Sequence, residues 1–94
     1  MTHVQLLEKR QQLLKRQIAD SLDLLIGSIG KSPTMRGHNL TTRIAGKTVT
    51  RYVRNDLVPQ ARAMSRRYHK LWRLLRQLSH VNWQLLQQQV PDRS

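Results

Sequence analysis

Hydrophobic residues recur at helical spacing over the first quarter of the chain. One stripe runs through Val4, Leu7, Leu14, Ile18 and Leu25, with Leu6, Leu13 and Leu22 beside it. Steps of three, four and seven positions return to the same side of an α-helix, so this pattern predicts a helix over about residues 3–25. Thr2 followed three positions later by Gln5 is typical of a capping box. The helix is therefore expected to begin just after Thr2.

Glycine, serine and proline crowd residues 27–38, which predicts a flexible connector. Over residues 39–54 the pattern changes, and β-branched Thr, Ile and Val stand on both sides of Ala45-Gly46. This arrangement predicts a β-hairpin. Its register stays open, because a two-residue turn at Ala45-Gly46 and a three-residue loop that includes Lys47 both fit the pattern.

A second, longer helix is predicted over about residues 57–89. Steps of four and three lead through Leu57, Ala61, Met64, Tyr68, Leu71, Leu75, Leu78, Asn82, Leu85 and Gln89, as in a heptad seam. Asp56 is favoured as the cap, because Pro59 then falls in the first turn, where a missing N–H is tolerated. Asn82 within the seam indicates either a polar contact that sets register or a frayed helix end.

The second helix is longer than the first can cover, so part of the seam needs another partner. A second copy of the chain is the expected partner, which predicts a homodimer. The residues expected at the dimer or partner interface are Tyr68, Leu71, Trp72, Leu75, Leu78, Asn82, Trp83 and Leu85. The predicted fold is thus α+β in a single domain, residues 1–94, with two long helices flanking the hairpin and a disordered tail over residues 90–94.

Composition limits what such a chain can be. It has 94 residues, 38% of them hydrophobic, and no cysteine, which excludes disulfides and thiolate metal sites. The longest apolar runs, such as residues 24–26, are far shorter than the ~20 residues that span a bilayer. The first residues lack the basic start and apolar run of a secretory signal, so we expect a cytoplasmic protein with no membrane contact.

The charge is strongly positive and unevenly placed. Seventeen Lys and Arg stand against five Asp and Glu, giving +12. Between residues 24 and 91 there are twelve basic residues and a single acid, Asp56. A solvated helix surface would carry acids three or four positions from its bases, and here they are missing. The pattern therefore favours an anionic partner.

The basic residues predicted to contact nucleic acid are Lys31, Arg36, Arg43, Lys47, Arg51, Arg54, Arg62, Arg66, Lys70, Arg73 and Arg76. The last five fall within about 120° on the second helix, and arginine forks bind phosphate bidentately. The hairpin bases alternate with threonines, and a two-stranded ribbon fits a DNA major groove about 12 Å wide. Alternatively, the hairpin caps the helical core through Leu40, Ile44, Val49 and Val53.

Other chemistry has little support in the sequence. The segment 27–32 has two residues between its glycines where a nucleotide-binding loop has four. His69 and His80 lie about 16 Å apart along a helix and cannot share a metal ion. No enzyme activity, cofactor or metal is therefore expected. Trp72 and Trp83 suit either base stacking on single strands or core and dimer contacts, and the second reading is favoured.

Several segments together resemble one family of small bacterial proteins of uncharacterised function. They are Gly27-Ser28, the run Leu40-Thr-Thr-Arg-Ile-Ala-Gly-Lys-Thr-Val-Thr-Arg-Tyr-Val53, Tyr68-His-Lys-Leu71 and Leu78-Ser-His-Val-Asn82. The resemblance implies a pattern of helix, Gly-Lys hairpin and helix. Genes of that family often lie near transposases, so the resemblance also implies an accessory role at mobile elements. Many relatives carry a cysteine-rich, zinc-like segment before the hairpin, which residues 31–38 of this chain lack.

Together these observations predict a non-enzymatic homodimer that binds nucleic acid, DNA in preference to RNA, and that can form part of a larger nucleoprotein assembly. The alternative is a helical adaptor or small subunit that packs on an acidic protein or a ribonucleoprotein complex, with Trp72 and Trp83 as anchors. A third hypothesis, a basic helix lying on an anionic membrane, is disfavoured because the second helix carries a seam suited to another helix.

Overall fold

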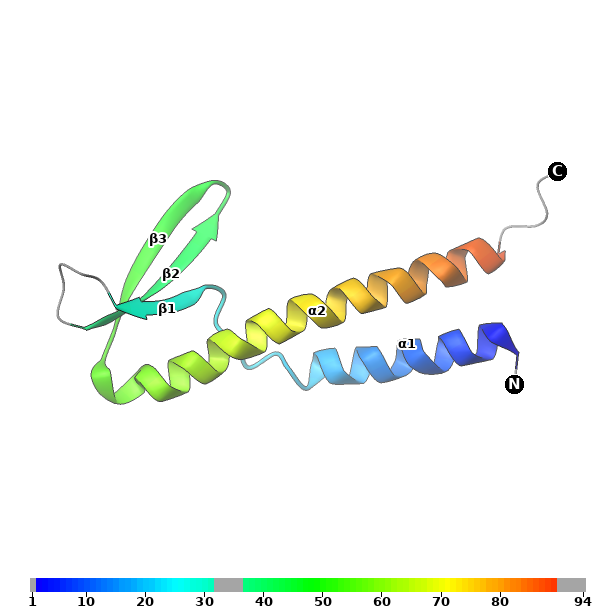
Figure 1. Ribbon diagram of the computed structural model, residues 1–94, viewed down its shortest axis with the longest axis horizontal. Coiled ribbons are helices and arrows are strands. Elements are labelled where there is room, and N and C mark those ends of the chain that lie inside the picture. The colour runs from blue at the N-terminus through cyan, green and yellow to red at the C-terminus, as the bar shows by residue number, and fades with distance from the viewer. Residues whose placement is uncertain (1, 32–36, 90–94) are drawn as a thin grey trace.

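The computed structural model describes residues 2–31 and 37–89 and confirms an α+β fold. Its elements are α1 (His3–Ala19), β1 (Ser28–Lys31), β2 (His38–Ile44), β3 (Lys47–Val53), the 3-10 turn η1 (Asn55–Leu57) and α2 (Val58–Gln89). Figure 1 shows α1 antiparallel beside one half of α2, with the sheet at the other end. The radius of gyration is 18.9 Å, against about 12 Å for a compact chain of this length. The molecule is therefore elongated and has little core.

The start of α1 confirms the predicted capping box. The Thr2 hydroxyl accepts a hydrogen bond from the Gln5 backbone N–H at 3.2 Å. In return, the Gln5 side-chain oxygen accepts one from the Thr2 N–H at 2.9 Å. Two of the N–H groups that a helix start leaves unpaired are thereby satisfied.

The end of the first helix was predicted wrongly, since α1 stops at Ala19 and not near residue 25. The chain after α1 instead runs along α2 and forms hydrogen bonds with it. These bonds join Arg67 Nη1 to the Asp23 carbonyl, the Leu25 N–H to the Met64 carbonyl, and the Ser65 hydroxyl to the Gly27 carbonyl. Tertiary partners thus satisfy backbone groups that a longer helix would have paired internally.

The sheet has three antiparallel strands in the order β1-β2-β3, one more than the predicted hairpin. Ile44 pairs with Lys47, so the turn is the two-residue Ala45-Gly46. Both turn residues have positive φ, 50° and 78°, as a type I′ hairpin turn requires. This resolves the register that the sequence left open.

Strand β1 lies inside the predicted connector, residues 27–38, and was not predicted. Gly27, just before β1, has φ of 136°, and a Cβ there would lie 2.4 Å from the Thr41 carbonyl oxygen. Only glycine allows this close approach of the two backbones. Residues 32–36 of the predicted connector and the predicted tail, 90–94, lie outside the described residues.

Helix α2 confirms the predicted second helix but buries two different faces along its length. Near its start, Val58, Ala61 and Ser65 are buried on the side that packs against β1 and the segment before it. Further along, Leu74 and Val81 are buried with Leu7 and Leu14 of α1. Ser65 and Leu74 lie about 180° apart on a helix with 100° per residue. The prediction of one continuous seam is therefore wrong.

Several predicted interface residues are used within the chain. Leu78 and Leu85 pack on the core between α1 and α2. Asn82 Oδ1 accepts a hydrogen bond from Gln11 Nε2 at 2.7 Å, so Asn82 makes the polar contact of the first interpretation, but with α1 of the same chain. Leu75, predicted in the seam, is 39% exposed while its neighbour Leu74 is 7% exposed. Within residues 2–31 and 37–89, no helix is long and apolar enough to cross a membrane.

Candidate nucleic-acid interface

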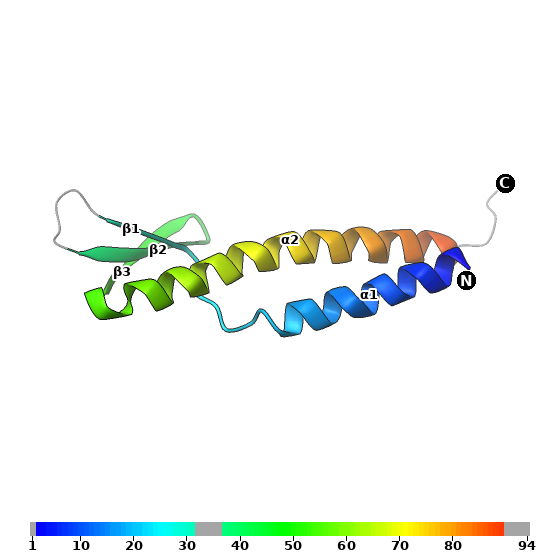
Figure 2. The ribbon, with the colours of Figure 1, turned by 60° about the horizontal axis from the view of Figure 1, so that its bottom comes forward.

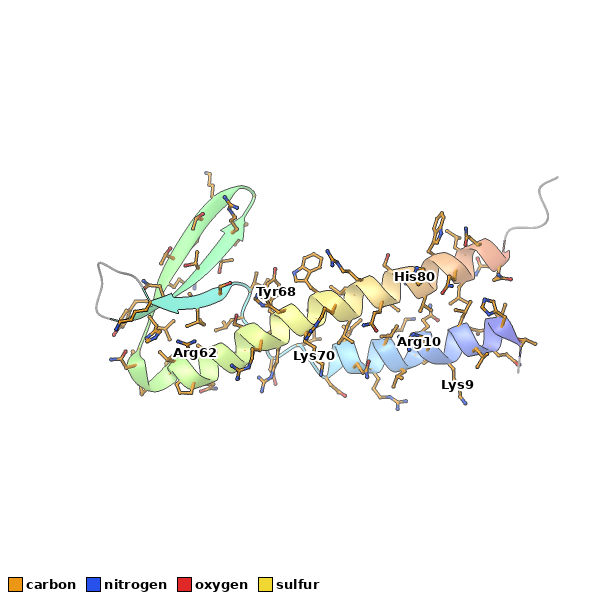
Figure 3. The ribbon with its side chains drawn as sticks, viewed as in Figure 1. Lys9, Arg10, Arg62, Tyr68, Lys70 and His80 are labelled. Atoms are coloured by element: carbon orange, nitrogen blue, oxygen red, sulfur yellow. The ribbon has the colours of Figure 1, made fainter. Side chains whose placement is uncertain are left out.

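A cleft of about 660 Å³ lies between the sheet and the first half of α2. Its lining residues are Ser28, Ile29, Arg62, Ser65, Arg66, His69 and Arg73. In Figure 2, β1 runs alongside this part of α2, and Figure 3 labels Arg62 on the helix next to the sheet. Three guanidinium groups thus share one concave surface.

Local packing explains why the arginines line a cleft and not a convex helix face. Arg62, Arg66 and Arg73 share one side of α2 because they are four and seven positions apart. Ser65 lies beside that side, and its hydroxyl donates to the Gly27 carbonyl at 2.6 Å. This small residue brings the start of β1 close to the helix, where the strand forms a wall next to the arginines.

No acid of the described part of the chain compensates the charge of the cleft. The one ion pair formed among the described residues is Arg54–Asp56, and neither of these residues lines the cleft. Hence no carboxylate of the described ranges lies within 4.0 Å of the Arg62, Arg66 or Arg73 guanidinium. Cations without counter-ions attract anions, and low-dielectric walls strengthen that field.

His69 adds a polar group with a defined proton. Its Nδ1 lies 2.9 Å from the Ser65 carbonyl oxygen, which can only accept a hydrogen bond. Nδ1 therefore carries a proton and donates it to this carbonyl.

A smaller basic pocket, about 310 Å³, continues along α2 toward its C-terminal half. It is lined by Arg10, Arg76, Gln77, His80, Val81 and Gln84. Arg10 reaches it from α1 and donates to the Gln77 side-chain oxygen at 3.3 Å (Figure 3). Sequence reasoning missed Arg10, because only the antiparallel packing of α1 on α2 brings it to this surface.

The other predicted basic residues are dispersed. Lys70 is exposed on α2 but outside both pockets, Lys31 ends β1, and Arg36 lies outside the described residues. Arg51 lines an apolar groove of about 500 Å³ with Leu40, Leu57 and Met64. The structure therefore brings three of the predicted arginines together in one cleft and a fourth, Arg76, into the neighbouring pocket.

Arg54 is already engaged by an acid of the chain. Its Nε and Nη2 donate to the two Asp56 carboxylate oxygens at 3.1 and 2.6 Å. The hydrogen bonds hold the pKa of Asp56 below its usual range and raise the pKa of Arg54. Asp56 lies in η1, and this contact, which was not predicted, weakens the assignment of Arg54 to a phosphate.

The hairpin projects from the body of the molecule. β1 pairs only with residues 38–41 of β2, and the Thr42 hydroxyl donates to the Ile26 carbonyl, so residues 43–48 form a free two-stranded ribbon (Figure 1). Leu40 at its base is 8% exposed, whereas Ile44 and Val49 are 60% and 40% exposed. The hairpin therefore caps the core only at the end where Leu40 lies, and not at Ile44 or Val49. At the free end, Arg43 and Lys47 lie on opposite faces, because side chains alternate along strands.

Both tryptophans lie outside the core, so the interpretation of either as a core contact is wrong. Trp72 is 52% exposed and Trp83 is 57% exposed. The Tyr68 ring contacts His69 at 5.4 Å between centroids and Trp72 at 6.4 Å, both edge to face. This aromatic cluster, Tyr68, His69 and Trp72, borders the cleft through His69.

No protein family, curated protein or solved structure matches the chain. The resemblance to small bacterial proteins therefore stays a prediction. Over the part of the chain that the structure describes, no three His, Asp or Glu side chains come together in a way that could hold a metal ion.

Proposed function

We propose that this protein binds nucleic acid without acting as an enzyme. The observation that carries the proposal is the cleft in which Arg62, Arg66 and Arg73 converge with no carboxylate partner among residues 2–31 and 37–89. Phosphate oxygens are the anions that a guanidinium fork binds best, through two parallel hydrogen bonds. The chain's +12 charge would also speed its encounter with a polyanion.

The free hairpin supports DNA over RNA as the preferred ligand. A two-stranded ribbon fits the major groove of B-form DNA, whereas the major groove of A-form RNA is too deep and narrow for side chains to read. The tip bases Arg43 and Lys47 project beyond the cleft and would contact phosphates on a neighbouring stretch of the same ligand. Such contacts add affinity without sequence preference.

The test compares two double variants with the same change in net charge. Arg66→Glu with Arg73→Glu alters the cleft, and Lys9→Glu with Lys15→Glu alters exposed positions of α1. Figure 3 shows Lys9 pointing away from α2. If about six phosphates are neutralised, log affinity falls with log salt at a slope near −5. The cleft variant loses two phosphate contacts, so its slope should be shallower, near −3. A flat salt response, or equal losses in both variants, would refute the proposal.

We further propose that two copies associate through the C-terminal half of α2. Residues 77–89 contain no Lys, Arg, Asp or Glu, although the chain carries +12. Trp83 and Leu86 are 57% and 51% exposed there. This is the stretch of α2 where two basic copies can pack without opposing arginines, and burial of these side chains favours association.

Light scattering of the nuclease-treated protein tests the dimer. We expect a dimer mass for the wild type, a monomer mass for Trp83→Gln, and no change for Leu6→Gln, which alters an equally exposed leucine of α1. A wild-type monomer at all concentrations would contradict the dimer and favour the adaptor role, in which a different protein covers this face.

A further inference from the structure

The two exposed tryptophans lie on one side of α2 but in different electrostatic surroundings. They are eleven residues, or about 16 Å, apart along the helix. Trp83 lies in the charge-free stretch 77–89, while Trp72 lies next to Arg73 in the arginine-bearing part of α2. A second copy placed over Trp72 would set arginines against arginines. A polyanion placed there would neutralise them.

Trp72 also has a geometry suited to a flat ligand. It faces away from α1, since Leu74, buried against α1, lies about 160° around the helix from it. The Tyr68 and Trp72 ring centroids lie 6.4 Å apart at an interplanar angle of 77°, so Tyr68 supports the indole from one side. More than half of its surface stays open to solvent.

The aromatic cluster is continuous with the phosphate-binding cleft. His69 lines the cleft with Arg66 and Arg73, and it also contacts Tyr68, whose ring contacts Trp72. Figure 3 shows Tyr68 on the part of α2 beside the sheet. A strand whose phosphates occupy the cleft would therefore carry its bases past Trp72.

We propose that Trp72 is a stacking platform for unpaired bases, and that the ligand of this surface is single-stranded DNA or an unpaired segment within a duplex. The proposal rests on the proposed function. Bases within a duplex are stacked on their neighbours and cannot offer a face to an indole, whereas unpaired bases can. Stacking on an aromatic side chain tolerates any sequence, because every base has such a face.

The experiment uses Trp72 as its own reporter. Trp83→Phe leaves Trp72 as the single tryptophan, and Trp72→Phe leaves Trp83. Each variant is titrated at low salt with a thymidine oligonucleotide and with a blunt duplex of equal phosphate number. We expect the single strand to quench Trp72 fluorescence and leave Trp83 unchanged, and the duplex to bind with little quenching of Trp72. We expect Trp72→Ala to bind the single strand roughly tenfold more weakly, the loss that one stacked base implies, and to bind the duplex unchanged.

The aromatic but smaller Trp72→Phe separates stacking from a folding defect, because it should retain most of the single-strand affinity. Far-ultraviolet circular dichroism verifies that each variant keeps its helices. If Trp72 fluorescence does not respond and Trp72→Ala binds both ligands as the wild type does, the stacking proposal is wrong, while nucleic-acid binding through the cleft stands. Equal quenching by the duplex would also overturn it. If neither ligand binds in a salt-dependent manner, the proposed function itself fails.

Discussion

Two adjacent leucines in α2 offer the sharpest test of how this chain builds its core. The heptad pattern places Leu75 in the seam, whereas the structure buries Leu74 against α1. Their exposed fractions are 7% for Leu74 and 39% for Leu75. Replacing each by alanine removes the same atoms, and alanine is at least as good a helix former as leucine. Any difference in stability therefore reports burial.

The structure sets the size of that difference. Truncation of a buried leucine removes its transfer free energy and leaves a cavity, at a cost of 2–5 kcal/mol in general. We expect about 3 kcal/mol for Leu74→Ala. Leu75 is partly exposed and borders solvent, so no closed cavity forms and we expect about 1 kcal/mol. A core this small implies a total free energy of unfolding of about 5 kcal/mol. In a domain of this size each kcal/mol shifts the melting temperature by about 5 °C, so Leu74→Ala would lower it by roughly 15 °C.

Urea unfolding followed by circular dichroism at 222 nm measures both variants. Dilute protein at moderate salt keeps self-association from contributing to the unfolding free energy, and a second, higher concentration reveals any such contribution. Equal costs at the two positions, or a larger cost for Leu75→Ala in dilute solution, would refute the assignment of the buried face.

Three further outcomes follow from the polar contacts and the hairpin turn. Asp56→Asn frees the Arg54 guanidinium, so the slope of log affinity against log salt should steepen by about one, and Asp23→Asn, which changes net charge equally, should leave that slope unchanged. Because Arg54 lowers the pKa of Asp56, this contact stabilises the folded state fully above the usual Asp pKa near 4. The stabilisation is lost as pH falls through the lowered pKa, and carboxyl NMR titration of Asp56 should show that pKa depressed. Ala45→Asn relieves a positive φ of 50° and should raise stability by up to about 1 kcal/mol in thermal unfolding, whereas a fall would contradict the type I′ turn.

The candidate site was predicted in part. The sequence identified Arg62, Arg66 and Arg73, because helical spacing alone puts them on one side of α2. It did not identify the concave shape, because the cleft wall is β1, a strand with little propensity of its own that exists by pairing with β2. It also missed Arg10, which reaches the basic surface from another helix.

Local interactions encode the start of α1 at its capping box, the position of the hairpin, and the extent of α2. Each depends on residues a few positions apart. Tertiary structure alone decided where α1 ends, whether β1 forms, and which face of α2 is buried at each point. Helix α2 carries apolar residues on more than one side, such as Leu74 and Leu75, and periodicity does not show which side meets a partner. That choice depends on α1 and the sheet covering opposite faces of α2, an arrangement of segments far apart in the chain.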